Sequence, residues 1–201
     1  MNKLTGLCVL VLITVCAGNV AGLELPSKGI EVLPPAPLTT LKPKSENKYG
    51  TIVRYAPTNG LYRDVVQVAV TALPANGWDL QFQFETAVPI EKNDVLLMRF
   101  FARTVATPNE RGNGRVRAIF EERKAPHTKS LNHEFELTRE WQEYYVPFIA
   151  EARYAAGTAS AGFHLGLDLQ TVEFADFHVL SFGKTVTVNQ LPRMRITYPG
   201  M

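Results

Sequence analysis

The chain has 201 residues, of which 46% are hydrophobic and 20% are charged, a composition typical of a globular protein and a length too short for two large domains. Its formal net charge is only +2, which excludes the strongly basic surface expected of a protein that binds nucleic acid or an anionic membrane. A near-neutral surface suits a neutral ligand.

The N-terminal segment 1–22 has the pattern of a secretory signal peptide. Lys3 supplies the positive charge, residues 7–15 form a short apolar run, and small residues follow it. Both cysteines, Cys8 and Cys16, lie in this segment, so we expect a mature chain with no disulfide and no thiol nucleophile. The sequence therefore predicts a secreted protein, extracellular or periplasmic, that its hydrophobic core alone stabilises.

Residues 23–48 are rich in proline. Proline cannot donate a backbone hydrogen bond and favours extended chain, so this composition predicts a mobile arm or linker and not a packed element.

From Tyr49 onward, short runs of β-branched and aromatic residues alternate with turn clusters, and no run carries a helical stripe. The expected strands are 51–55, 64–72, 78–85, 95–104, 116–123, 133–137, 142–148, 161–169 and 172–182. Many short strands at regular spacing predict an all-β sandwich, which we expect to be a monomer.

Alternation assigns side chains to the two faces of these strands. In one run, Leu96, Met98 and Phe100 oppose a mixed face that carries Arg99 and Phe101. A fully solvated face would carry fewer aromatic side chains, so this mixture indicates a partly covered face that binds a ligand.

The segment around Trp78 is the most informative part of the chain. Trp78 follows a turn and leads into a strand in which Gln81 and Gln83 alternate with apolar residues. An indole offers a flat apolar platform with a polar edge, and a glutamine amide donates and accepts hydrogen bonds as a sugar hydroxyl does. This surface is typical of one that binds a neutral sugar polymer, although Trp78 is as readily interpreted as a core residue.

Other polar and aromatic residues extend this candidate surface. Glu121 could accept a hydrogen bond from a sugar hydroxyl, Tyr154 could stack at the end of a groove, and His164 is either a ligand contact or a partly exposed strand histidine. The candidate ligand-binding residues are Trp78, Gln81, Gln83, Arg99, Phe101, Arg103, Glu121, Tyr154 and His164.

We expect no catalytic residues. Glycosidases need two carboxyl groups at a controlled separation. Adjacent Glu121 and Glu122 point to opposite faces of a strand, and so do Glu173 and Asp176, which lie an odd number of residues apart. The four histidines lack metal-binding spacing, and no Gly-x-Ser-x-Gly motif is present.

Five motifs in order resemble the carbohydrate-binding modules of families 4, 9 and 22, which are jelly-roll β-sandwiches of the galactose-binding-domain type found beside xylanases and glucanases. These motifs are 78–81 (WDLQ), 94–103 (DVLLMRFFAR), 138–144 (TREWQEY), 163–166 (FHLG) and 170–177 (QTVEFADF). The resemblance implies a polysaccharide ligand, xylan or a related β-glycan. It also places Asp176 where such modules tend to carry an acidic ligand of a structural calcium ion, and it implies no other cofactor.

The resemblance divides the chain into a signal peptide (1–22), a proline-rich arm (23–48), a carbohydrate-binding sandwich (49–183) and a C-terminal connector (184–201) like those that precede family 10 glycoside hydrolase barrels. A (β/α)₈ barrel needs about 250 residues, so we expect a binding module without its catalytic domain.

Three hypotheses about function remain open. The chain is a secreted, non-catalytic carbohydrate-binding module, the leading module of a truncated xylanase, or a structural exported sandwich that docks another protein. The last would show no affinity for sugar and an apolar exposed patch in place of an amide-rich one.

Overall fold

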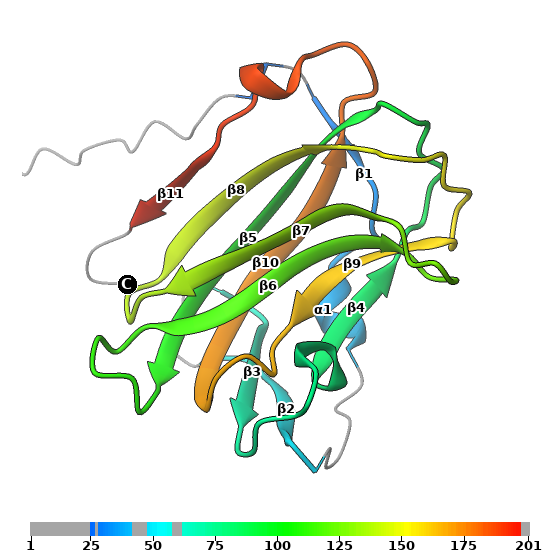
Figure 1. The fold of residues 1–201 in the computed structure, drawn as a ribbon. Helices are drawn as coiled ribbons and strands as arrows, with labels where there is room; N and C mark the ends of the chain where they lie inside the picture. The colour runs from blue at the N-terminus through cyan, green and yellow to red at the C-terminus, as the bar shows by residue number, and fades with distance from the viewer. Residues whose placement is uncertain (1–24, 27, 42–47, 58–61, 198–201) are drawn as a thin grey trace, which may run out of the picture.

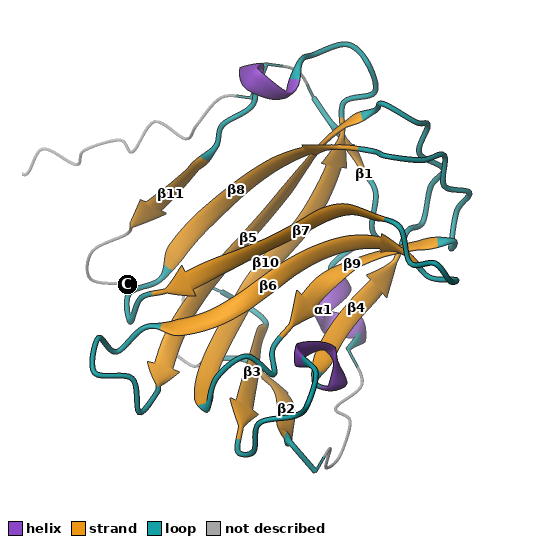
Figure 2. Cartoon of the chain, in the orientation of Figure 1, coloured by secondary structure: helices purple, strands orange, loops and turns teal. Residues whose placement is uncertain are grey.

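The computed structural model describes residues 25–26, 28–41, 48–57 and 62–197. The predicted signal peptide and both cysteines lie outside these residues. Two antiparallel β-sheets pack face to face (Figures 1 and 2). The strands are β1 (Ile30–Glu31), β2 (Gly50–Tyr55), β3 (Val65–Val70), β4 (Gln81–Glu85), β5 (Val95–Ala106), β6 (Gly114–Glu122), β7 (Lys129–Leu137), β8 (Gln142–Ile149), β9 (Ala159–His164), β10 (Gln170–Ser181) and β11 (Met194–Thr197). The helical elements are α1 (Pro37–Thr40), η1 (Gly77–Asp79) and η2 (Val188–Gln190).

The seven-stranded sheet has the order β11-β8-β5-β10-β3-β2, with β1 also paired to β10, and the four-stranded sheet has the order β4-β9-β6-β7. Sequence-adjacent strands often lie in different sheets, as β4 and β5 do, so the chain crosses repeatedly between the layers. This arrangement confirms the predicted all-β sandwich, and each of the nine predicted strands overlaps an observed one.

Aromatic side chains fill the space between the sheets. Phe163 of β9 lies with its ring centroid 4.5 Å from that of Phe174 on β10 and 4.8 Å from that of Phe100 on β5. Phe100 in turn stacks on Tyr144 of β8, with centroids 4.9 Å apart. Because side chains alternate along a strand, these inward aromatic residues fix which residues of each strand point outward.

The N-terminal part of the fold differs from the prediction. Residues 30–41 were expected to form a mobile arm, but β1 pairs with the end of β10, and Val32, Leu33 and Leu38 are buried in the core. The prolines do not oppose this packing, since Pro37 occupies the first turn of α1, where no backbone N–H is needed. The sandwich therefore begins at Ile30 and not at Tyr49.

The predicted connector also belongs partly to the fold. Val186 and Leu191 are buried against Val95, Leu97 and Tyr145 on the outer face of the seven-stranded sheet, and β11 pairs with β8. Apolar residues on that outer face explain why the segment packs there and does not extend away from the sandwich. Among the residues that the structure describes, no helix is long and apolar enough to span a membrane.

Replacing Phe163 by alanine should lower the free energy of unfolding by about 3–5 kcal/mol, because the cavity would lie between both sheets. Denaturant unfolding followed by tryptophan fluorescence measures this. The control is Val105→Ala, at a side chain that is 41% exposed on β5, which should change stability by less than about 0.5 kcal/mol. Equal effects of the two substitutions would contradict the central position assigned to Phe163.

Candidate functional site

Trp78 lies on η1, which is tied to the end of β9. Asn76 and Asp79 form a capping box around the short helix. The N–H of Gly166 donates to the carbonyl of Gly77 at 3.1 Å, and the N–H of Leu165 donates to that of Leu80 at 2.9 Å. These backbone bonds hold the Trp78 ring 6.1 Å from the ring of His164, in an edge-on arrangement.

The exposure of Trp78 settles its assignment as a surface residue. The side chain is 51% exposed, whereas the neighbouring β4 residues Phe82 and Phe84 are buried in the core. A half-exposed indole at the end of a sheet is available to a ligand, and the alternative interpretation of Trp78 as a core residue is wrong.

A row of polar side chains crosses the outer surface of the four-stranded sheet beside Trp78. Ser160 on β9 donates to Gln83 at 2.7 Å, and the Gln83 amide donates to Gln81 at 2.6 Å and to Glu121 on β6 at 3.0 Å. Lys129 on β7 forms an ion pair with Glu121. We call this surface the amide face, and it consists of Trp78, Gln81, Gln83, Glu121, Lys129, Ser160 and His164.

Strand register explains why these residues share one surface. Gln81 is paired with His164, and His164 with Arg117 on the far side. Glu121 is paired with Ser160. Directly opposed residues in antiparallel strands point to the same face of a sheet, so the inward orientation of Phe82 and Phe163 turns Gln81, Gln83 and His164 outward together.

His164 is buried although it belongs to the amide face. Its side chain is 3% exposed, and its Nδ1 atom is buried without a hydrogen-bond partner. Burial lowers the pKa of His164 to about 4, and Lys129 and Arg117 act in the same direction while Glu121 opposes them. The imidazole is therefore neutral at neutral pH, and its unpartnered nitrogen is the kind of buried polar atom that native proteins rarely leave unused.

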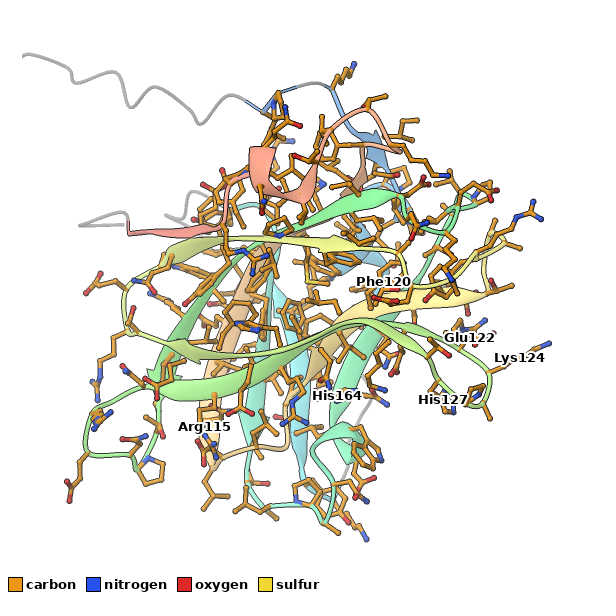
Figure 3. The ribbon with its side chains drawn as sticks, turned by 45° about the horizontal axis from the view of Figure 1, so that its top comes forward. Arg115, Phe120, Glu122, Lys124, His127 and His164 are labelled. Atoms are coloured by element: carbon orange, nitrogen blue, oxygen red, sulfur yellow. The ribbon has the colours of Figure 1, made fainter. Side chains whose placement is uncertain are left out.

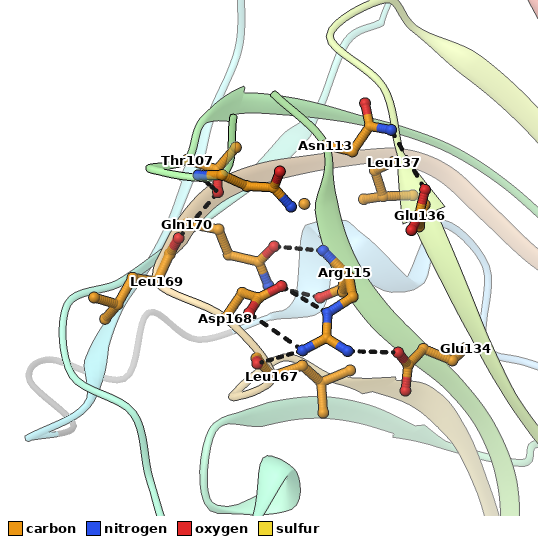
Figure 4. Close-up of polar contacts among 12 residues, drawn as sticks. Thr107, Asn113, Arg115, Glu134, Glu136, Leu137, Leu167, Asp168, Leu169 and Gln170 are labelled. Atoms are coloured by element: carbon orange, nitrogen blue, oxygen red, sulfur yellow. Dashed lines mark hydrogen bonds and ion pairs between the residues drawn. The ribbon is translucent and has the colours of Figure 1, made fainter. Parts of the chain in front are cut away.

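Arg115 organises the end of the four-stranded sheet where β9 turns toward β10 (Figures 3 and 4). Its guanidinium donates to Asp168 at 2.7 Å, to Glu134 at 3.1 Å and to the Leu167 carbonyl at 3.2 Å. The Gln170 side chain accepts from the Arg115 N–H at 2.7 Å and donates to its carbonyl at 2.6 Å. The charge of Arg115 is thus balanced by the carboxylates of Asp168 and Glu134.

The structure places all of the candidate ligand-binding residues except Tyr154 in two groups. Trp78, Gln81, Gln83, Glu121 and His164 lie on the amide face. Arg99, Phe101 and Arg103 share one face of β5, as predicted, but this is the outer face of the other sheet, so the whole core lies between the two groups.

Ion pairs occupy the charged groups on that second surface. Arg99 donates to Glu143 at 2.5 Å, and Arg103 donates to Glu173 at 2.7 Å. Glu173 also accepts from Tyr55 at 2.6 Å and from Gln67 at 2.8 Å. Both carboxylates are buried and satisfied by their partners, as a buried charge requires.

Tyr154 is not at the end of a groove. Its ring is 1% exposed and packs against Phe120 in the core, and its hydroxyl lies 2.8 Å from that of Ser130. Burial raises its pKa. A ring enclosed in this way has no surface left for stacking on a ligand, so the expectation of stacking is wrong.

Asp176 does not fit the calcium-ligand role that the resemblance implies. Its carboxylate lies 3.0 Å from Nη2 of Arg99 and 3.0 Å from Nε2 of His178, whose Nδ1 lies 2.7 Å from Glu31. Hydrogen bonds to Asp176 and Glu31 raise the pKa of His178 to about 9, so a cation already lies between the two carboxylates. Among the described residues, no group of three or more His, Cys, Asp or Glu side chains is placed to hold a metal ion.

Sequence reasoning missed Lys129 and Ser160 of the amide face and also Arg117, which is paired with His164 beside it. Residues an even number apart on a strand share one face. This rule could have identified Arg117, four residues before Glu121, and Ser160, four residues before His164. Lys129 could not be found in this way, because β7 begins four residues earlier than its hydrophobic pattern indicates and a register shift precedes its pairing with Glu121.

The pKa of His164 predicts a pH dependence of stability. The folded-state pKa of about 4 lies below the ordinary value of 6.5, so the unfolded chain takes up the proton first and stability falls as the pH drops from about 6.5 toward 4. The loss attributable to this group is at most about 3 kcal/mol. Thermal unfolding of the wild type and of His164→Gln at a series of pH values checks this, since the variant should lose stability less steeply. Parallel curves would contradict it.

Comparisons with known proteins identify the fold. No protein-family model matches the chain, and no curated protein matches it. Among solved structures, the second N-terminal cellulose-binding domain of Cellulomonas fimi β-1,4-glucanase C matches with a TM-score of 0.55 at 15% identity, over 79% of this chain and 98% of that domain. A putative sugar-binding protein from Bacteroides thetaiotaomicron matches with a TM-score of 0.52 at 9% identity, over 77% and 95%.

A CBM4 module matches with a TM-score of 0.50 at 16% identity, over 66% of this chain and 77% of that one. At these identities the likeness concerns the fold. The chain therefore has the jelly-roll β-sandwich fold of the carbohydrate-binding modules that its sequence resembles.

Proposed function

We propose that this protein is a non-catalytic carbohydrate-binding module and that the amide face binds a neutral β-linked polysaccharide. The observation that carries the proposal is the half-exposed Trp78 beside a hydrogen-bonded row of amide, hydroxyl and carboxylate groups on one sheet. An aromatic platform packs against the apolar face of a pyranose ring, while the amides exchange hydrogen bonds with its equatorial hydroxyls.

The charge of the surface favours a neutral ligand. Glu121 is neutralised by Lys129, and the arginines at the adjacent end of the sheet are paired with Asp168 and Glu134. A ligand with an anionic backbone would therefore gain little electrostatic attraction and would have to compete with existing ion pairs. Neutral β-glycans meet no such competition.

Xylan is the first ligand to test, because the sequence resembles modules that accompany xylanases. Cellulose is the second, since one structural neighbour is a cellulose-binding domain. We further propose that the protein acts as a secreted monomer, which the signal-peptide pattern of residues 1–22 supports.

Trp78→Ala should weaken binding to soluble xylan about 5- to 150-fold, the equivalent of about 1–3 kcal/mol for a contact at the centre of an interface. The fold should persist, since Trp78 lies outside the core clusters. Affinity electrophoresis of the mature chain in gels that contain xylan, cellulose derivatives or no polysaccharide measures the effect.

The control for this experiment is Val53→Ala, at a side chain that is 48% exposed on β2 of the other sheet, and it should migrate as the wild type does. Retention of Trp78→Ala equal to that of the wild type would place the binding surface elsewhere. Absence of retention of the wild type in every gel would contradict the proposed function and favour the hypothesis of a protein-docking sandwich.

The purified chain should not hydrolyse xylan. Glu121 and Glu173 belong to different sheets and face opposite sides of the sandwich, so they cannot flank one glycosidic bond as catalytic carboxyl groups must. A reducing-end assay of the mature chain with xylan tests this, with the double variant Glu121→Gln, Glu173→Gln as the control. Sugar released above that control would show that the chain is an enzyme.

A further inference from the structure

We infer that the protein has a second ligand site, a pocket on the opposite side of the sandwich from the amide face, and that this pocket binds a short neutral saccharide. The pocket has a volume of about 570 Å³, within the range of small-molecule sites. Residues that carry the argument are Thr39 of α1, Tyr62, Arg99 and Phe101 of β5, and Asp176 and His178 of β10.

The pocket exists because one edge of β10 changes partner. Up to Ala175, β10 pairs with β3, and from Leu180 onward it pairs with β1. Between these two pairings, a bulge displaces residues 176 and 177 relative to β5. The interval is flanked by α1, which follows β1, and by the segment that leads into β3. The gap between the two edge strands, β3 and β1, is thus enclosed as a pocket. Bulges of this kind commonly change the direction of side chains at binding sites.

The backbone of Asp176 supports a role for the bulge. Asp176 has a φ of 49°, in the left-handed region that residues other than glycine adopt uncommonly. This conformation directs its carboxylate to Arg99 and His178, both of which line the pocket. Unusual backbone conformations of this kind are concentrated at ligand sites, where the surrounding structure maintains them.

The lining favours a sugar ring over other small molecules. Tyr62 and Phe101, with ring centroids 4.9 Å apart, supply an aromatic wall. The polar groups are already paired, because Arg99 meets Glu143 and Asp176 while His178 lies between Asp176 and Glu31. These five groups sum to one net negative charge, and Arg63 and Asp64 in the lining offset each other, so the site offers hydrogen bonds and no attraction for an anion. A neutral ligand with one apolar face and several hydroxyls matches it, as a pyranoside does.

The size of the pocket limits the ligand to a chain end or a side branch. The amide face extends across four strands and can follow a polymer, whereas this pocket is closed on one side by α1. Two sites on opposite faces would let one molecule hold two polysaccharide chains, or two parts of one chain, and so raise its apparent affinity for an insoluble matrix. The second site does not depend on the amide face being a binding surface.

The test is a titration of ¹⁵N-labelled mature protein with methyl β-D-xylopyranoside, methyl β-D-glucopyranoside and xylohexaose, observed through backbone amide shifts. We expect saturable shifts of the amides of Thr39, Arg63, Asp64 and His178, with dissociation constants in the millimolar range, for at least one of the two glycosides. Amides of the amide face should respond to xylohexaose.

Two matched substitutions on α1 make the test specific. Thr39 and Thr40 each donate a hydroxyl hydrogen bond to the carbonyl three residues earlier, but only Thr39 belongs to the pocket lining. Thr39→Trp should fill the pocket and abolish the shifts of its amides, while Thr40→Trp should retain them.

The experiment tests the pocket independently of the amide face. If no glycoside shifts the pocket amides, or if the shifts are the same in Thr39→Trp, the second site is wrong, whatever the amide face does. If Trp78→Ala removes the response of the amide face and leaves the pocket response intact, both sites are supported as independent. A pocket response that disappears in Trp78→Ala would also contradict the second site, since it would show that the two regions form one site.

Discussion

The contact of Phe163 with Phe100 and Phe174 is the interaction on which the rest of the structure depends. It joins β9 of the four-stranded sheet to β5 and β10 at the centre of the seven-stranded sheet. Because side chains alternate along a strand, fixing Phe163 inward fixes His164 outward. A slip of one residue in β9 would turn Ser160 and His164 inward and expose Phe163. The composition of the candidate surface is therefore a consequence of how the core packs.

The two outer faces of the sandwich differ in how their polar side chains are paired. On the seven-stranded sheet, Glu143 and Glu173 are buried, and arginines neutralise them directly. Segments from both ends of the described chain, α1 and the residues around Leu191, pack over the same sheet. The four-stranded sheet also carries ion pairs, Lys129–Glu121 and Arg117–Glu134 among them, but beside Trp78 the side chains of Gln81, Gln83 and Ser160 are joined by hydrogen bonds between uncharged groups. Such bonds can be exchanged for bonds to a ligand at low cost, whereas a buried ion pair cannot.

The sequence predicts most of the fold, because hydrophobic alternation reports directly on strands with one buried face. It separates Leu96, Met98 and Phe100 from Arg99 and Phe101 correctly. The prediction fails for segments that do not show alternation of apolar and polar residues. A two-residue strand such as β1 is too short to show a period, and its partner on β10 is 150 residues away in sequence. Alternation within one strand also does not reveal which sheet the strand joins. Arg99 and Gln83 therefore appear equivalent in the sequence, although they lie on opposite outer faces of the sandwich.

The unpartnered nitrogen of His164 links the folding of the amide face to its proposed use. A buried imidazole nitrogen without a hydrogen bond costs about 1–3 kcal/mol, and the neutral form that burial imposes still has one nitrogen that accepts and one that donates. The Trp78 ring lies edge-on to this imidazole, with ring centroids 6.1 Å apart, and the unpartnered nitrogen itself is not exposed to a ligand. A hydroxyl can serve either nitrogen, since it both donates and accepts. A polyhydroxy ligand on the proposed binding surface would therefore recover part of the stability given up at His164 only if the Trp78 ring moved and exposed that nitrogen.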